Sequence, residues 1–189
     1  MANVIKSKRA VASLEAENLL PKNTIYYSNP LDFHINYNRQ TKAHKEKRIQ
    51  LRKQWLNDAI ESTKDCNVMF LDPDNGLEIK FVSKLSQIKS GKFAYYFEVK
   101  EFFNNQKTCV IYHHLNRNST HNMQMQYRAT QLRNMVNYDS VVFGIRFYPY
   151  SPRAYFILVT KNKACEMRQK IKTFLSSPCG IGWDSYHEA

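Results

Sequence analysis

The sequence predicts an α/β domain with a mostly parallel sheet, helices on both faces and a C-terminal antiparallel strand pair. Three observations lead to this prediction. Short apolar segments alternate with longer segments of helical periodicity, which is typical of parallel sheets. The apolar run 68–71 has no polar break, which favours a strand buried on both faces in the middle of such a sheet. Segments 140–147 and 153–160 are joined by a short turn, which favours an antiparallel pair.

The remaining elements follow from local patterns. Apolar spacing up to Pro21 predicts a first helix over 1–20, and 24–27 is a short β-type run. The longest helix is predicted over 40–63, because Leu51, Trp55 and Ala59 share one face. Further strands are expected at 93–97 and 108–112, and further helices at 122–136 and 163–175; segment 98–105 fits either a strand or a helix.

Length and composition predict one globular domain. The chain has 189 residues, of which 43% are hydrophobic, so we expect residues 1–176 to form a single α/β domain. Pro178, Gly180 and Gly182 predict a loose tail over 177–189. No apolar run is long enough to cross a bilayer and no signal peptide is present, so the expectation is a cytoplasmic protein without a membrane partner.

The charge balance points to a polyanionic partner. Lys and Arg number 28 against 16 Asp and Glu, for a net charge of +12, which indicates nucleic acid, either DNA or RNA. The first half of helix 40–63 is the densest basic cluster, although a solvated helix face is the alternative. The predicted nucleic-acid-binding residues are Lys42, Lys45, Arg48, Arg52, Arg117, Arg146 and Arg153.

Polar chemistry follows two predicted strands. Asp72-Pro73-Asp74-Asn75-Gly76 comes after strand 68–71, and His113-His114 ends the next apolar strand. In open α/β sheets ligands bind at the carboxyl ends of the strands. Adjacent strand residues point to opposite faces, so at most one of the two histidines enters the site. The candidate catalytic residues are Asp72, Asp74, Asn75, Glu98, Lys100, His113 and His114.

Five segments of the chain together resemble a bacterial family that has no settled activity. They are FLDPDNGLE at Phe70–Glu78, IYHHLNR at Ile111–Arg117, LLP at Leu19–Pro21, YYSNPL at Tyr26–Leu31, and IRF with SPRAYF between Ile145 and Phe156. The family is itself distantly similar to Rossmann-type, SAM-dependent nucleic-acid methyltransferases, which carry an Asp-Pro-Pro-Tyr motif after a strand. The resemblance therefore implies a Rossmann-like fold.

The resemblance also implies roles for several residues. Asp72 would accept a hydrogen bond from an exocyclic amine, Asn75 would orient the base edge, and His113 or Arg117 would contact the substrate or its phosphate. The chain departs from the methyltransferase pattern, since it has no Gly-rich loop for SAM and Asn75 replaces the aromatic residue that stacks on a flipped base. Members of the resembled family carry a further N-terminal segment, where a methyltransferase would bind SAM. The resemblance therefore does not imply that this chain binds SAM by itself, and the cofactor is left unassigned.

Two alternatives remain. Pro73-Asp74 followed by Glu98-Val99-Lys100 matches the pattern of Mg²⁺-dependent nucleases, in which Asp72, Asp74 and Glu98 would bind the metal and Lys100 would lie beside the attacking water. The other alternative is a non-enzymatic basic binding module or accessory subunit, with a protein partner or a second copy of the chain.

Overall fold

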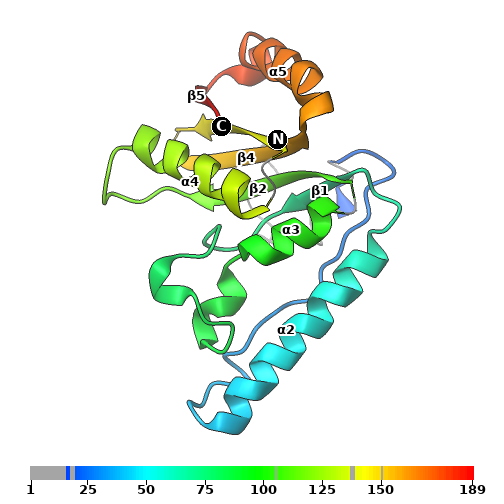
Figure 1. Ribbon diagram of the computed structural model, residues 1–189, viewed down its shortest axis with the longest axis vertical. Coiled ribbons are helices and arrows are strands. Elements are labelled where there is room, and N and C mark those ends of the chain that lie inside the picture. Colours follow the sequence, from blue (N-terminus) through cyan, green and yellow to red (C-terminus); the bar gives the residue numbers. More distant parts are fainter. Residues whose placement is uncertain (1–15, 18–19, 105, 137–138, 150) are drawn as a thin grey trace.

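A computed structural model describes residues 16–17, 20–104, 106–136, 139–149 and 151–189 (Figure 1). The predicted helix over 1–20 lies almost entirely outside these ranges. The elements are α2 (Lys42–Ser62), β1 (Val68–Leu71), η2 (Lys80–Val82), η3 (Ile88–Lys92), α3 (Tyr96–Asn104), β2 (Thr108–His114), α4 (His121–Val136), β3 (Ser140–Phe147), β4 (Arg153–Thr160), α5 (Lys161–Leu175), η4 (Pro178–Gly180) and β5 (Trp183–Glu188). None of the described helices is both long and apolar enough to cross a bilayer.

The fold is a mixed α/β structure with one open sheet, in the strand order β1-β2-β4-β3-β5. The prediction of a mostly parallel sheet is wrong, because β1 and β2 form the one parallel pair while β2–β4, β3–β4 and β3–β5 are antiparallel. The physical reason is the place of β4. β4 pairs with β3 in the predicted antiparallel hairpin, but it lies between β3 and β2. β1, β2 and β3 therefore run in one direction, although β3 is not a neighbour of β2.

Helices cover both faces of the sheet, as predicted. Alternate residues of β4 separate the two cores. Ala154, Phe156 and Leu158 pack with residues of α2, α3 and α4, whereas Tyr155 and Val159 lie in a second core with α5. Figure 1 shows α5 on one side of the sheet and α3 and α4 on the other.

The position of β1 differs from the prediction. It is an edge strand with one covered face: Met69 is buried, whereas Val68 is 57% and Phe70 is 52% exposed. An unbroken apolar run indicates two buried faces only when helices cover both, and α5 packs against β3, β4 and β5. Among the residues that the structure describes, no helix covers the face of β1 that carries Val68 and Phe70, hereafter the open face.

Three other local predictions are corrected. Residues 177–189 do not form a loose tail, because β5 pairs with β3 and the Arg146 side chain holds Asp184 through two hydrogen bonds, of 2.7 and 2.6 Å. The 24–27 run forms no strand. In the predicted strand 93–97, only Ala94 bridges to Leu77, and the chain becomes helical at Tyr96.

The long helix α2 matches the prediction, and it is fastened at both ends. The Thr41 hydroxyl accepts from the His44 N–H at its start. At its end the buried Lys107 ammonium donates to the carbonyls of Thr63, Lys64 and Cys66, at 2.7 to 2.8 Å. A cation is favourable at this position because the last carbonyls of a helix lack intrahelical partners.

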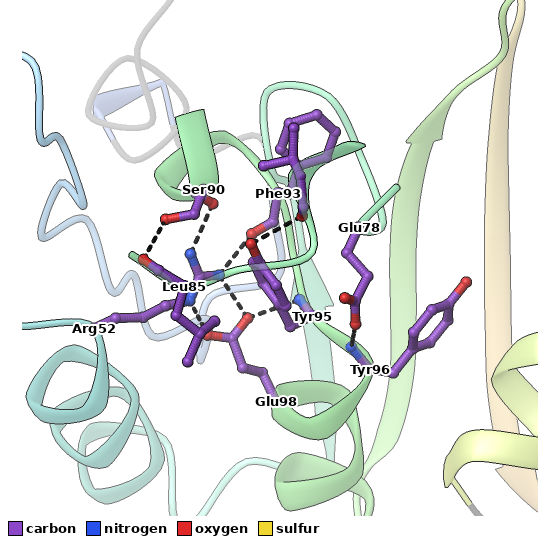
Figure 2. Close-up of polar contacts among 9 residues, drawn as sticks. Arg52, Glu78, Leu85, Ser90, Phe93, Tyr95, Tyr96 and Glu98 are labelled. Atoms are coloured by element: carbon purple, nitrogen blue, oxygen red, sulfur yellow. Dashed lines mark hydrogen bonds and ion pairs between the residues drawn. The ribbon is translucent and has the colours of Figure 1, made fainter. Parts of the chain in front are cut away.

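A buried ion pair joins α2 to the start of α3 (Figure 2). Arg52 donates from Nε to one carboxylate oxygen of Glu98 at 2.6 Å and from Nη2 to the other at 2.8 Å. The same guanidinium donates to the carbonyls of Ser90 and Phe93 and lies 4.4 Å from the centre of the Tyr95 ring. Glu98 also accepts from the Tyr95 N–H at 2.8 Å, which caps the first turn of α3.

The ion pair fixes the segment on which the Asp72–Gly76 loop rests. The backbone just before α3 binds this loop through Asn75 N–H to Lys92 O at 3.0 Å and Ala94 N–H to Gly76 O at 2.9 Å. Arg52 binds Ser90 O and Phe93 O, which lie on either side of Lys92 in the chain. The position of the Asp72–Gly76 loop therefore depends on α2, which carries Arg52.

We predict that Arg52→Met lowers the free energy of unfolding by about 3–5 kcal/mol, because it leaves the Glu98 carboxylate buried without a counter-ion. Urea unfolding followed by circular dichroism measures this loss. The matched control, Lys53→Met on the exposed face of the same helix, changes it by less than about 0.5 kcal/mol. The double variant Arg52→Met/Glu98→Gln should recover part of the lost free energy of unfolding, because it removes the unpaired charge. If the double variant is as unstable as Arg52→Met, the unpaired carboxylate is not the cause of the loss.

Candidate nucleic-acid interface

Several predicted site residues lie at one edge of the sheet, where β1 and β2 end and β4 begins. In the register of the sheet His114 pairs with Arg153 and Tyr112 with Tyr155. Asp72 follows the last residue of β1, which runs parallel to β2. The alternation of strand residues places Asp72, His114 and Arg153 at the end of the open face. Asp72, His114 and Arg153 therefore lie at the same end of this face.

The Asp72–Gly76 segment forms a tight turn. The Gly76 N–H donates to Pro73 O at 3.3 Å, and Gly76 has a φ of +95°, a conformation that side chains other than glycine rarely adopt. A Cβ at Gly76 would also lie 2.4 Å from His113 Nδ1. The side chains of Asp74 and Asn75 are exposed, and Asp74 pairs with Lys92 at 3.4 Å. Glycine therefore lets the turn approach the end of β2.

The two histidines have different surroundings. His113 is buried, and its Nδ1 accepts a hydrogen bond of 3.1 Å from the Leu77 N–H, so it fastens the turn to β2. Burial is the main cause that lowers the pKa of His113 to about 3, and the positive charges of Arg128 and His114 contribute to that shift. His114 is exposed, with Nδ1 3.4 Å from the Tyr112 hydroxyl. His113 thus has a structural role, and only His114 reaches the open face, as the alternation predicted.

The Asp72 carboxyl group interacts with charges on two neighbouring side chains. Partial burial raises the pKa of its carboxyl group, and the nearby charge of Asp74 raises it further, while Arg153 lowers it. Burial likewise raises the pKa of Tyr155, and the negative charge of Asp72 contributes to that shift. Asp72, Arg153 and Tyr155 therefore interact electrostatically across the end of the open face.

Aromatic side chains cover the open face beside these polar groups. The rings of Phe70 and Tyr155 are stacked, with centroids 6.4 Å apart and an angle of 15° between their planes. The Tyr112 ring meets Tyr155 edge-on at 5.8 Å, and Trp183 lies 5.1 Å from Tyr155 on the side covered by α5. Phe70, Tyr112 and Tyr155, hereafter the aromatic face, form a row of rings that begins at the exposed Phe70 and continues through the partly buried Tyr112 and Tyr155.

The metal site of the nuclease alternative is not formed. Glu98 and Lys100 lie on the helix α3, not on a strand, and the Glu98 carboxylate is taken up by Arg52 and the Tyr95 N–H. Within the described ranges no three His, Cys, Asp or Glu side chains are grouped as metal ligands. Glu98 is a structural residue, and Lys100 is an exposed residue on the same helix.

The predicted nucleic-acid-binding residues fall into three groups. Arg48 and Arg52 are corrected: both are buried, and Arg48 donates to the carbonyls of Ser86, Tyr37 and Arg39. Their aliphatic stems and strong donors suit them to holding loops against α2. Arg146 is paired with Asp184. Lys42, Lys45, Arg117 and Arg153 reach solvent, and neither Arg117 nor Arg153 forms an ion pair with any residue that the structure describes.

Sequence reasoning missed the aromatic face. Its signal was present, since Phe70 and Asp72, Tyr112 and His114, and Arg153 and Tyr155 alternate in register along three strands. It also missed Glu78, whose carboxyl pKa is raised by burial and which accepts from the Tyr96 N–H at 2.9 Å. No local pattern distinguished this acid from others.

Comparison with protein-family models, with curated proteins and with solved structures found no match to the chain.

The lowered pKa of His113 predicts acid sensitivity. The unfolded chain takes up a proton near the ordinary pKa of 6.5, whereas the folded protein resists protonation down to about 3. Stability is therefore present above pH 6.5 and lost as the pH falls, by roughly 2 kcal/mol between pH 7 and 5. Chemical unfolding across this range measures the loss.

His113→Asn supplies the control, because its side-chain oxygen retains an acceptor for the Leu77 N–H but does not titrate. We expect a flatter stability profile for this variant between pH 7 and 5. If the free energy of unfolding falls equally with pH in the unaltered protein and in His113→Asn, His113 is not the titrating group.

Proposed function

We propose that this protein binds single-stranded nucleic acid, with bases on the aromatic face and the backbone beside His114 and Arg153. The observation that carries the proposal is the aromatic face, with its exposed Phe70 and partly buried tyrosines, next to Arg153 in a chain of net charge +12. The proposal concerns recognition, and Asp72 and Asn75 are the residues that a methyltransferase-like reaction would use.

Base stacking explains why aromatic rings would stand on an open sheet face. Exposed rings on a strand surface receive the flat faces of unpaired bases, and each stacked base contributes about 1–3 kcal/mol. Duplex nucleic acid does not offer its base faces in this way. The stacked pair of Phe70 and Tyr155, with Tyr112 at its side, supports a single-stranded ligand.

Polar groups at the end of the aromatic face add selectivity. Asp72 is an acceptor suited to the exocyclic amines of adenine, cytosine or guanine, and uracil and thymine lack such an amine. Arg153 and His114 supply donors suited to phosphate oxygens. The opposite charges of Asp72 and Arg153 at one edge are consistent with a base edge and a backbone phosphate lying side by side.

The sheet also supports a distant Rossmann-like relationship as part of the proposal. Because β1, β2 and β3 run in one direction, their carboxyl ends share an edge, and that is where ligands bind in open α/β sheets. A metal-dependent nuclease is less well supported, since Glu98 is engaged by Arg52.

We predict that Phe70→Ala and Tyr112→Ala each weaken binding of a mixed-sequence single-stranded oligonucleotide by about tenfold or more, through the loss of base stacking. Fluorescence anisotropy measures the affinity. Tyr127→Ala is the matched control, because Tyr127 is an exposed aromatic residue of α4, on the opposite face of the sheet. Full affinity in both aromatic-face variants would overturn the proposal; a loss confined to them, with circular dichroism unchanged, supports it.

The charge contribution is tested by salt dependence. A plot of log affinity against log salt concentration has a negative slope that steepens with each phosphate contact. We expect Arg153→Gln to reduce the magnitude of this slope by about 1, which corresponds to the loss of one phosphate contact. Replacing both Lys42 and Lys45 with glutamine should reduce it further if α2 tracks the backbone; an unchanged slope would exclude α2. Lys170→Gln on α5 is the control for the loss of one positive charge, because Lys170 is not among the proposed binding residues.

A further inference from the structure

A cavity lies just past the end of β2, next to the aromatic face. Its volume is about 640 Å³, and it is lined by His114, Leu115, Asn116, Arg117, His121, Ser151 and Pro152. None of these lining residues is acidic. Five of them, His114, Asn116, Arg117, His121 and Ser151, carry side chains that donate hydrogen bonds. A concave surface with many donors and no carboxylate favours an anionic ligand.

The walls of the cavity are held in place by hydrogen bonds. The Leu115 N–H donates to Pro152 O at 3.4 Å, which ties the chain after β2 to the chain before β4. Gln124 of α4 accepts from the Asn116 N–H at 3.1 Å and donates to Asn116 O at 2.9 Å and to Ser119 O at 2.8 Å. The loop that carries Arg117 is therefore ordered before any ligand arrives.

The tautomer of His121 is fixed by its neighbours. Arg146 Nη1 lies 3.2 Å from His121 Nδ1, and a guanidinium can only donate, so Nδ1 accepts and Nε2 carries the proton. Asp184 holds Arg146 through two hydrogen bonds and keeps it in position. Arg146 thus acts as a positioning residue, and it leaves His121 a hydrogen-bond donor at the cavity.

We propose that this cavity binds the phosphate group of a nucleotide, with Arg117 as its main ligand and His114, His121 and Ser151 as further donors. Arg117 is exposed and has no ion-pair partner among the described residues, so its donors remain for a ligand. The inference rests on the proposed function, because His114 lines the cavity and also contacts Tyr112 of the aromatic face. A nucleotide whose base stacks on Tyr112 has its phosphate near this cavity.

Nuclear magnetic resonance titration tests the cavity without an oligonucleotide. The ring protons of His114 and His121 are followed while thymidine monophosphate, inorganic phosphate or thymidine is added. We expect saturable shifts of both rings with thymidine monophosphate and no shift of the His121 ring with thymidine. Arg117→Gln should weaken the binding of thymidine monophosphate by about tenfold, because it removes charge-assisted hydrogen bonds to the phosphate. Shifts with inorganic phosphate also support the site and show that the base is dispensable.

Two results would overturn the cavity proposal: no saturable shift with either phosphate compound, or full binding by Arg117→Gln. Arg39→Gln is the matched control, because Arg39 is an exposed arginine that does not line the cavity. Its binding should equal that of the unaltered protein.

A backbone scan separates this inference from the proposed function. In a short oligonucleotide each phosphate is replaced in turn by an uncharged methylphosphonate, and affinity is measured for the unaltered protein and for Arg117→Gln. We expect one position at which neutralisation weakens the unaltered protein but not the variant. If the aromatic variants lose affinity while no such position exists, only the cavity is wrong. If phosphate binds the cavity but the aromatic variants keep full affinity, only the proposed function is wrong.

Discussion

The buried pair of Arg52 and Glu98 is the constraint on which the candidate site depends. It joins the long helix α2 to the start of α3 and holds the carbonyls on both sides of Lys92. That backbone in turn carries the Asp72–Gly76 turn. Taking two charges out of water is costly, and here the cost is offset by hydrogen bonds to nearly every polar atom of the pair. A substitution of Arg52 in α2 is therefore expected to shift the Asp72–Gly76 turn at the edge of the sheet.

At the end of β2, two adjacent histidines have different surroundings: one stabilises the fold, and the other lies on the face that we propose for recognition. His113 points to the covered face and fastens the glycine turn, while its neighbour His114 points to the open face and the cavity. Neutral imidazole suits the first position, because a buried acceptor for a backbone N–H must keep its lone pair. The exposed ring next to it keeps its freedom to meet a ligand.

The arginines of the candidate site and its supports differ in whether other protein groups bind their side chains. Arg48, Arg52 and Arg146 are committed to carbonyls or carboxylates, whereas Arg117 and Arg153 remain without ion pairs among the described residues. Net charge alone indicated a polyanionic ligand but did not locate the surface that binds it. The surface that we propose for this ligand is the edge of the sheet where the aromatic face, Asp72, Arg117 and Arg153 occur together.

Local patterns determined much of this protein: the helix that became α2, the strands that became β2, β3 and β4, the hairpin, and the glycine turn after β1. Hydrophobic periodicity and turn chemistry act over a few residues, so they can be read from the chain. The tertiary structure decided the rest. The insertion of β4 between β2 and β3, the exposure of β1 and the burial of Arg48 and Arg52 depend on contacts between segments far apart in sequence, which no local pattern encodes.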